Sequence, residues 1–498
     1  MVNLFFVHGL GLLGEGLKNT SCMQRKVCRY VVFLLLSLYL CGEVLHYMIK
    51  YTKYLFLLLL VASCASHRPM RRSVRHADAM PALPYGVQQT VVGVQEDKQK
   101  EKEAAAYARP SVSQVEYAPQ GTWQYAKQMA LDTLCQSSLF ETSQLGLYVY
   151  DLTESKPLYA VNAAHRMRPA SCQKLVTAIT ALHYLKGNYQ FHTDFRITGK
   201  VTKGTLQGDL IVVGGMDPMV STDELLVAAR QIKQQHGINS IAGSVVLDLT
   251  MREDTPYGWG WCWGDDYGPL SALLADGKDC FKQKWIEALG KANIKCDTAF
   301  TIKVHNPKTT ASKTSPASTS VYSIQHNIDE LLNPMMKKSD NIYAECLFYQ
   351  IAATVAEKGA GQKEAAQRTA ELMEQIGLQP EQYKVADGSG LSLYNYASAE
   401  MLVAMLRYAW HTEHIHKQLL TSLPISGFDG TLKKRMIGTP AEGNVRAKTG
   451  SVSGIASLAG YITASNGHIL AFAIINQGVA PLSAGRAFQD NVCIELSK

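Results

Sequence analysis

The chain has 498 residues, 47% of them hydrophobic, and a formal net charge of +7 at pH 7. This length predicts two or three domains, and the apolar content is enough to fill their cores, which excludes a disordered or fibrous protein. After the first 63 positions the chain carries 43 basic and 40 acidic residues. A balance of this kind gives no basic face, so we predict no nucleic-acid partner.

The N-terminal region resembles a bacterial lipoprotein signal. A basic start at 48–53 precedes an unbroken apolar run at 54–62, which is too short to span a bilayer, and Cys64 follows. We expect residues 48–63 to be a signal peptide and Cys64 to be acylated, so that a lipid anchors the chain to a membrane. The residue directly after Cys64 is not acidic, which favours a periplasm-facing position on the outer membrane. The alternative is a stray hydrophobic stub.

Two further segments flank this signal. A second apolar run lies at 31–40, and because tandem signals are unusual we interpret residues 1–47 as an overextended reading frame. Residues 64–120 are polar and include the mixed-charge run EDKQKEKEAAAYA. That composition cannot bury enough apolar surface to fold alone, so we predict a disordered tether.

The folded part begins near residue 122 with a helix, two short strands at 145–152 and 157–162, and a helix that opens at Ser171. An alternating, glycine-punctuated stretch at 195–215 then precedes a helix at 223–235 and a strand at 244–248. A tryptophan-rich stretch and a loop at 308–320 follow. We interpret 191–320 as an inserted, mostly β domain.

Helical patterns return from residue 328, with helices after Asn341, at 363–376 and at 399–410. The chain closes with a hairpin of 454–463 and 467–475 and a last helix from Ala484. The first and last hairpins both need partners, so we predict one antiparallel sheet built from the two ends of the chain. Residues 121–190 and 321–498 would then form an α+β domain, a sheet flanked by helices with a helical subdomain.

Seven cysteines remain outside the leader and the lipid site. They are odd in number, widely spaced and without a CxxC pair, so neither a disulfide scaffold nor a zinc ribbon is expected, although one bridge stays open. They are Cys135, Cys172, Cys262, Cys280, Cys296, Cys346 and Cys493.

One short motif suggests a nucleophile. Ser171 and Lys174 lie three residues apart at a helix start, so the amine can reach the hydroxyl. A lysine acts as a base only if desolvation or a second cation lowers its pKa. Lys448-Thr449-Gly450, at the start of the closing hairpin, supplies such a cation, and Ser339-Asp340-Asn341 lies between the two. Each motif alone is weak, but each occurs once and in this order.

Together the three motifs match the set of serine β-lactamases and penicillin-binding proteins. With blocks such as GDLIVVGGMDP, DGSGLS and LPISGFDGTLKKR, the chain from about residue 122 resembles the class C low-molecular-mass penicillin-binding proteins, the D-alanyl-D-alanine carboxypeptidase/endopeptidase family. The resemblance implies a penicillin-binding transpeptidase/β-lactamase-like fold. It also implies a peptidoglycan stem peptide as substrate, β-lactams as covalent inhibitors, and neither a cofactor nor a metal.

The resemblance also implies the role of each site residue. Ser171 would be the acylated nucleophile and Lys174 its base, and the backbone N–H groups of Ser171 and Ser451 would form the oxyanion hole. Ser339 and Asn341 would relay the leaving-group proton and hold the substrate amide. Lys448 would polarise the site. The residues expected to contact substrate are Asp340, Thr449, Gly450 and Ser451.

Two other functions stay open, a serine β-lactamase and a catalytically silent wall-binding lipoprotein. No Glu-x-x-Leu-Asn deacylation motif follows Asn341, which favours the peptidase.

Other features have structural interpretations. We expect the tryptophans at 259–263 to form a packing or site-bordering loop. The histidines at 411–416 are expected to lie at a solvated helix end, and Asp387 and Asp429 to form turns.

Overall fold

The computed structural model describes residues 115–262, 268–296, 302–305, 317–357 and 359–498, with the backbone alone at 302–305. The predicted signal, Cys64 and most of the predicted tether lie outside these residues. Among the described residues, no helix combines the length and apolar character needed to cross a membrane.

The central element is a five-stranded antiparallel sheet with the order β12-β13-β14-β1-β2. Its strands are β1 (Gln144–Asp151), β2 (Lys156–Val161), β12 (Arg446–Val452), β13 (Ile455–Thr463) and β14 (Ile469–Gln477). Strand β1, near the start of the folded part, pairs with β14 along its whole length, from Gln144 opposite Gln477 to Asp151 opposite Leu470. The sheet predicted from the two ends of the chain is therefore present.

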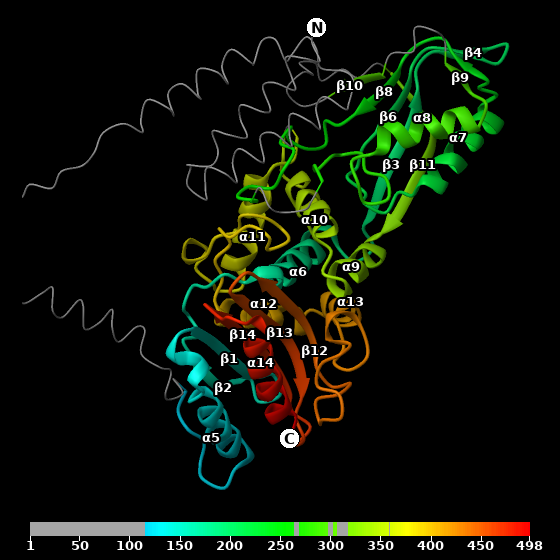
Figure 1. Cartoon of the computed structure of the whole chain (residues 1–498). Helices are drawn as coiled ribbons and strands as arrows, with labels where there is room; N and C mark the ends of the chain where they lie inside the picture. The colour runs from blue at the N-terminus through cyan, green and yellow to red at the C-terminus, as the bar shows by residue number, and fades with distance from the viewer. Residues whose placement is uncertain (1–114, 263–267, 297–301, 306–316, 358) are drawn as a thin grey trace, which may run out of the picture. The chain divides into compact units, whose positions relative to one another are not determined.

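The alternating residues of this sheet point into two separate cores. On β14, Leu470, Phe472 and Ile474 pack with α5 (Trp123–Cys135) and α14 (Leu482–Ser497), while the intervening residues pack against the opposite layer of helices. Buried on both faces, β13 and β14 have the near-continuous apolar sequences expected of central strands. Figure 1 shows α14 against one face of the sheet and α12 against the other.

The second layer consists of helices that surround α6 (Gln173–Leu185), which is buried along most of its length. Its neighbours are α9 (Ile328–Lys337), α10 (Asn341–Ala353), α11 (Gln362–Gln375), α12 (Ala399–Trp410) and α13 (Glu413–Ser422). Four short 3-10 turns complete this part of the chain: η2 (Ser138–Glu141), η3 (Ala170–Cys172), η4 (Pro380–Gln382) and η5 (Gly430–Leu432). The fold is the predicted one, an antiparallel sheet flanked by helices with a helical subdomain.

The inserted region has its own sheets and its own core. One sheet has the order β10-β8-β6-β3-β11 and a smaller one has the order β4-β5-β7-β9. Helices α7 (Thr222–His236) and α8 (Phe281–Lys291) pack on them around Phe195 and Trp285. Helix α8 was not predicted from the pattern. The strands are β3 (Gln190–Ile197), β4 (Lys200–Thr202), β5 (Thr205–Gln207), β6 (Leu210–Val213), β7 (Ser240–Ile241), β8 (Val245–Asp248), β9 (Lys295–Cys296), β10 (Ile302–His305) and β11 (Thr319–Asn327).

The entry and exit of the inserted region lie side by side. Strand β3 pairs antiparallel with β11, and Gln190 at one end is the partner of Asn327 at the other. Strand β11 continues past residue 320, the predicted end of the inserted domain, because its pairing with β3 extends to Asn327. An insertion with adjacent ends leaves the sheet and helices of the surrounding domain unbroken.

Candidate active site

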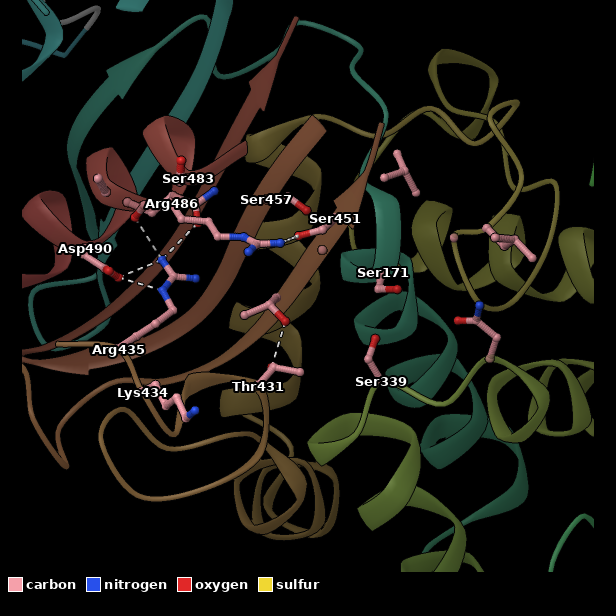
Figure 2. Close-up of a pocket in the computed structure, with 18 residues that line it drawn as sticks. Ser171, Ser339, Thr431, Lys434, Arg435, Ser451, Ser457, Ser483, Arg486 and Asp490 are labelled. Carbon is pink, nitrogen blue, oxygen red and sulfur yellow. Dashed lines mark hydrogen bonds and ion pairs between the residues drawn. The ribbon is translucent and has the colours of Figure 1, made fainter. Parts of the chain in front are cut away.

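Ser171 lies in the 3-10 turn η3, directly before α6, and lines a cavity of about 730 Å³. The residue before it, Ala170, has φ +46°, a left-handed conformation that is unfavourable for alanine. Such conformations persist where the surroundings impose them, and they concentrate at functional sites. Figure 2 shows Ser171 and Ser339 close together, with strand β12 and its Ser451 beside them.

Lys174 is fully buried, and its amine lies 3.0 Å from Ser171 Oγ. It donates to Asn341 Oδ1 at 2.6 Å and to the backbone oxygen of Ser389 at 2.8 Å. A neutral amine has two N–H donors and one lone pair. The protonated amine donates to all three oxygens; in the neutral form, whose two donors stay with Asn341 and Ser389, the lone pair faces the Ser171 hydroxyl.

Burial lowers the pKa of Lys174 to about 8, although the carboxylates of Asp387 and Glu345 oppose this shift. Burial is the main reason why the pKa of Lys448 lies well below its usual range, and the positive charge of Lys174 lowers it further. Of the two causes expected from the sequence, desolvation is therefore the larger one for Lys174. A substantial share of Lys174 is neutral near pH 8 and able to accept a proton.

Lys448 joins the second and third motifs. Its buried amine donates to Ser339 Oγ at 2.8 Å and to the backbone oxygen of Thr449 at 2.7 Å. Ser339 has φ +63°, so the backbone turns sharply just before α10 begins. Ser339 and Asn341 line the cavity, while the carboxylate of Asp340 accepts from the N–H of Tyr343 and caps α10. Asp340 is the one predicted contact residue that does not line the cavity.

Two glycines allow the close approach of β12 and of the 388–392 loop to the nucleophile. A Cβ on Gly450 would lie 2.1 Å from Ser457 Oγ and 2.7 Å from the backbone oxygen of Pro169. A Cβ on Gly390 would lie 1.9 Å from the backbone oxygen of Ala170, and its φ of +80° also disfavours other residues. Gly450 lines the cavity with Thr449 and Ser451.

One family model matches the chain. The model of the D-Ala-D-Ala carboxypeptidase 3 (S13) family matches residues 127–278 and 275–494, which is well over half of the chain. The chain belongs to this family. The resemblance predicted from the motifs is confirmed, and with it the enzyme class, a serine-type carboxypeptidase.

Curated relatives named D-alanyl-D-alanine carboxypeptidases are similar over most of their length. The D-alanyl-D-alanine carboxypeptidase DacB of Haemophilus influenzae is 26% identical, with 67% of this chain and 85% of the relative covered. The D-alanyl-D-alanine carboxypeptidase of Actinomadura sp. strain R39 is also 26% identical, with 74% of this chain and 84% of the relative covered. The crystal structure of penicillin binding protein 4 from H. influenzae has a TM-score of 0.65 at 25% identity, over 72% of this chain and 97% of that chain.

Three features of this S13 site were not predicted from the sequence as parts of it. The backbone oxygen of Ser389 is a partner of Lys174, and the buried Glu345 accepts from the N–H groups of Ser389 and Gly388 at 2.8 and 3.3 Å. Burial raises the pKa of Glu345 to about 8. The third feature is Arg486 on α14, which lines the cavity. None has a local pattern, because each acts only through the tertiary fold.

The remaining candidates have structural contacts. Asp387 accepts from the N–H groups of Gly390 and Ser392 and from the indole N–H of Trp261, so it builds the loop beside the site. Asp429 accepts from the N–H of Ile425 and pairs with Lys337.

The histidine segment and the cysteines also have structural positions. In the 411–416 segment His411 and His414 are exposed, as a solvated helix end requires. All seven described cysteines are free thiols.

Proposed function

We propose that this chain is a serine D-alanyl-D-alanine carboxypeptidase that cleaves peptidoglycan stem peptides through an acyl-enzyme on Ser171. One observation carries the proposal: the buried amine of Lys174 lies 3.0 Å from Ser171 Oγ, and its other partners are the oxygens of Asn341 and Ser389. The names of the relatives, D-alanyl-D-alanine carboxypeptidases, support the substrate class.

In the first step, Ser171 Oγ attacks the carbonyl carbon between the two D-alanines while Lys174 takes the hydroxyl proton. The carbonyl oxygen becomes an oxyanion, for which the N–H groups of Ser171 and Ser451 are the proposed donors. The C–N bond then breaks, and the departing amine receives the proton that Lys174 took, relayed by the hydroxyl of Ser339, which contacts the Lys448 amine at 2.8 Å; Lys174 is neutral again. D-Alanine leaves, and the peptide remains as an ester on Ser171.

In the second step, water hydrolyses this ester and regenerates the Ser171 hydroxyl. A β-lactam forms the same kind of ester, and its slow hydrolysis would make it a covalent inhibitor. A crystal structure of the H. influenzae protein complexed with a β-lactam, at 25% identity and a TM-score of 0.59, supports this extension.

The cellular place of the enzyme is a further part of the proposal. The apolar run at 54–62 followed by Cys64 supports a lipid anchor on the periplasmic side of the outer membrane, with residues 64–120 as a tether to the folded part. A tether of this kind would let the cavity reach the cell wall while the lipid stays in the membrane.

Digestion of purified peptidoglycan, with the products measured by mass, tests the activity. We expect stem pentapeptides to lose the mass of one alanine residue, and Ser171→Ala to leave them intact. Conversion of cross-linked dimers to monomers would show endopeptidase activity in addition. Unchanged stem peptides with the wild-type enzyme would contradict the proposal.

A further inference from the structure

The cavity has a cationic side that the three motifs do not explain. Besides the motif residues, its lining includes Lys434, Arg435 and Arg486, against one acidic residue, Asp490. Figure 2 shows Arg486 reaching toward Ser451, with Arg435 and Asp490 next to each other and Lys434 below Arg435. The charges of these groups differ in how far carboxylates compensate them, and of the exposed cations Arg486 is the one that contacts the motif residue Ser451, whereas Lys434 serves as the comparison.

Arg435 is neutralised and acts as a structural link. Its guanidinium forms an ion pair with Asp490 at 2.7 Å and also donates to Gln489 Oε1 and to the backbone oxygen of Arg486, both at 3.1 Å. It therefore fastens its loop to α14. Its positive charge is already matched by a carboxylate.

Lys448 is also a poor candidate for anion binding. Its amine is fully buried and is committed to Ser339 Oγ and the Thr449 backbone oxygen. Burial, with the nearby charge of Lys174, also disfavours its protonated form.

Arg486 is exposed and has no carboxylate partner among the described residues. Its guanidinium donates to Ser451 Oγ at 3.1 Å. A serine hydroxyl that accepts from a guanidinium keeps its own O–H available to donate. Arg486 and Ser451 together therefore present N–H and O–H donors to the same part of the cavity, a combination that suits a carboxylate.

The packing of α14 explains why Arg486 reaches this position. Gly485 is buried, and a Cβ on it would lie 3.2 Å from Ala456 Cβ. Ala456 on β13 is the cross-strand partner of Ser451 on β12. The helix thus lies on the strand next to Ser451, and the residue after Gly485 extends its side chain to that serine.

Resting on the proposed function, we propose that Arg486 determines specificity by supplying the positive charge that recognises the free terminal carboxylate of the substrate. Thr449 and Ser451 supply neutral donors to this group, and the guanidinium adds the charge. The contact lies on an exposed side chain, so added salt weakens it.

Two peptides test the inference: diacetyl-L-Lys-D-Ala-D-Ala and its C-terminal amide. We expect Arg486→Gln to lower kcat/KM for the acid about 10- to 100-fold, the size of one charge-assisted hydrogen bond, and for the amide less than about threefold. Arg486→Lys keeps the charge and retains part of the preference. Arg230→Gln, an exposed position on α7 away from the cavity lining, keeps both rates.

The inference would be overturned if Arg486→Gln changed the ratio of kcat/KM for the acid to kcat/KM for the amide by less than about threefold. It would also be overturned if Lys434→Gln lowered this ratio as much as Arg486→Gln does. Failure of the wild type to hydrolyse the acid would instead contradict the proposed function. In that case the rates of Ser171 acylation by benzylpenicillin and by its methyl ester test the role of Arg486 without peptide hydrolysis. Arg486→Gln should slow the reaction with the free acid more than the reaction with the ester.

Discussion

Lys174 Nζ lies 2.6 Å from Asn341 Oδ1 and thereby connects α6, which follows the nucleophile, to α10, which begins at Asn341. The two residues are far apart in the sequence, and both are buried. Their contact orients the lysine amine, because an amine bound to Asn341 and to the Ser389 oxygen has one direction left, toward Ser171. The site is thus a property of packed helices as much as of the motifs.

The orientation and the lowered pKa of Lys174 predict the pH dependence of acylation. Only the neutral amine accepts a proton, so the rate of reaction with benzylpenicillin should rise with pH and level off above the pKa of about 8. Each pH unit well below that value should cost about tenfold. Stopped-flow measurement between pH 6 and 9 checks this, and a flat profile would contradict the role of Lys174 as the base.

Replacing the base itself gives a matched comparison. Lys174→Arg keeps the positive charge but cannot lose its proton, so acylation should fall by about 10²- to 10⁴-fold at pH 8 and above, and the rise of the rate with pH should disappear. If the arginine variant kept the wild-type rate and pH profile, proton transfer to residue 174 would not take part in the reaction.

Gly450 should be essential for the reaction because of the space around it. In Gly450→Ala the new Cβ meets Ser457 Oγ and the Pro169 backbone oxygen, so β12 must move away from the nucleophile. We expect penicillin acylation to fall by at least about 100-fold. Gly290→Ala, on α8 where a Cβ meets nothing within 4 Å, is the control and should react normally. Wild-type acylation by Gly450→Ala would refute the close approach of the strand.

Asp387 should contribute to stability. It is buried and accepts from Gly390, Ser392, the Asn395 side chain and Trp261. Asp387→Ala leaves these donors without their acceptor, and we expect the free energy of unfolding to fall by about 3 kcal/mol or more. Trp261→Phe removes a single donor and should cost about 1 kcal/mol. Denaturant unfolding measures both, and equal stability of Asp387→Ala and wild type would contradict this role.

The lipid anchor has its own test, independent of catalysis. Metabolic labelling with palmitate should tag the wild-type protein and leave Cys64→Ser unlabelled. Equal labelling of the two would refute acylation at Cys64.

The sequence predicted the parts of the fold that rest on local patterns. The short segments at 145–152 and 157–162 around a turn and the closing hairpin of 454–463 and 467–475 identified the strands, and their need for partners led to the observed sheet. The spacing of Ser171 and Lys174 likewise predicted their contact. The partners that depend on packing were out of reach, because neither the Ser389 oxygen nor Glu345 differs locally from any other backbone oxygen or helical glutamate.

Arg486 shows the same limit more clearly. It is one arginine on an amphipathic helix, and its position next to Ser451 follows from Gly485 packing on Ala456 and from the pairing of β12 with β13. No motif encodes that relationship. For Lys174 the sequence left two causes of a lowered pKa open, and the structure shows burial to be the larger one.

The central claim, that Ser171 is the acylated nucleophile, is tested most directly by mass analysis of the chain after reaction with benzylpenicillin. The account predicts one adduct, on the tryptic peptide 167–174, that persists in Cys172→Ala and is absent from Ser171→Ala. An adduct of equal yield in Ser171→Ala, or one located outside that peptide, would contradict it.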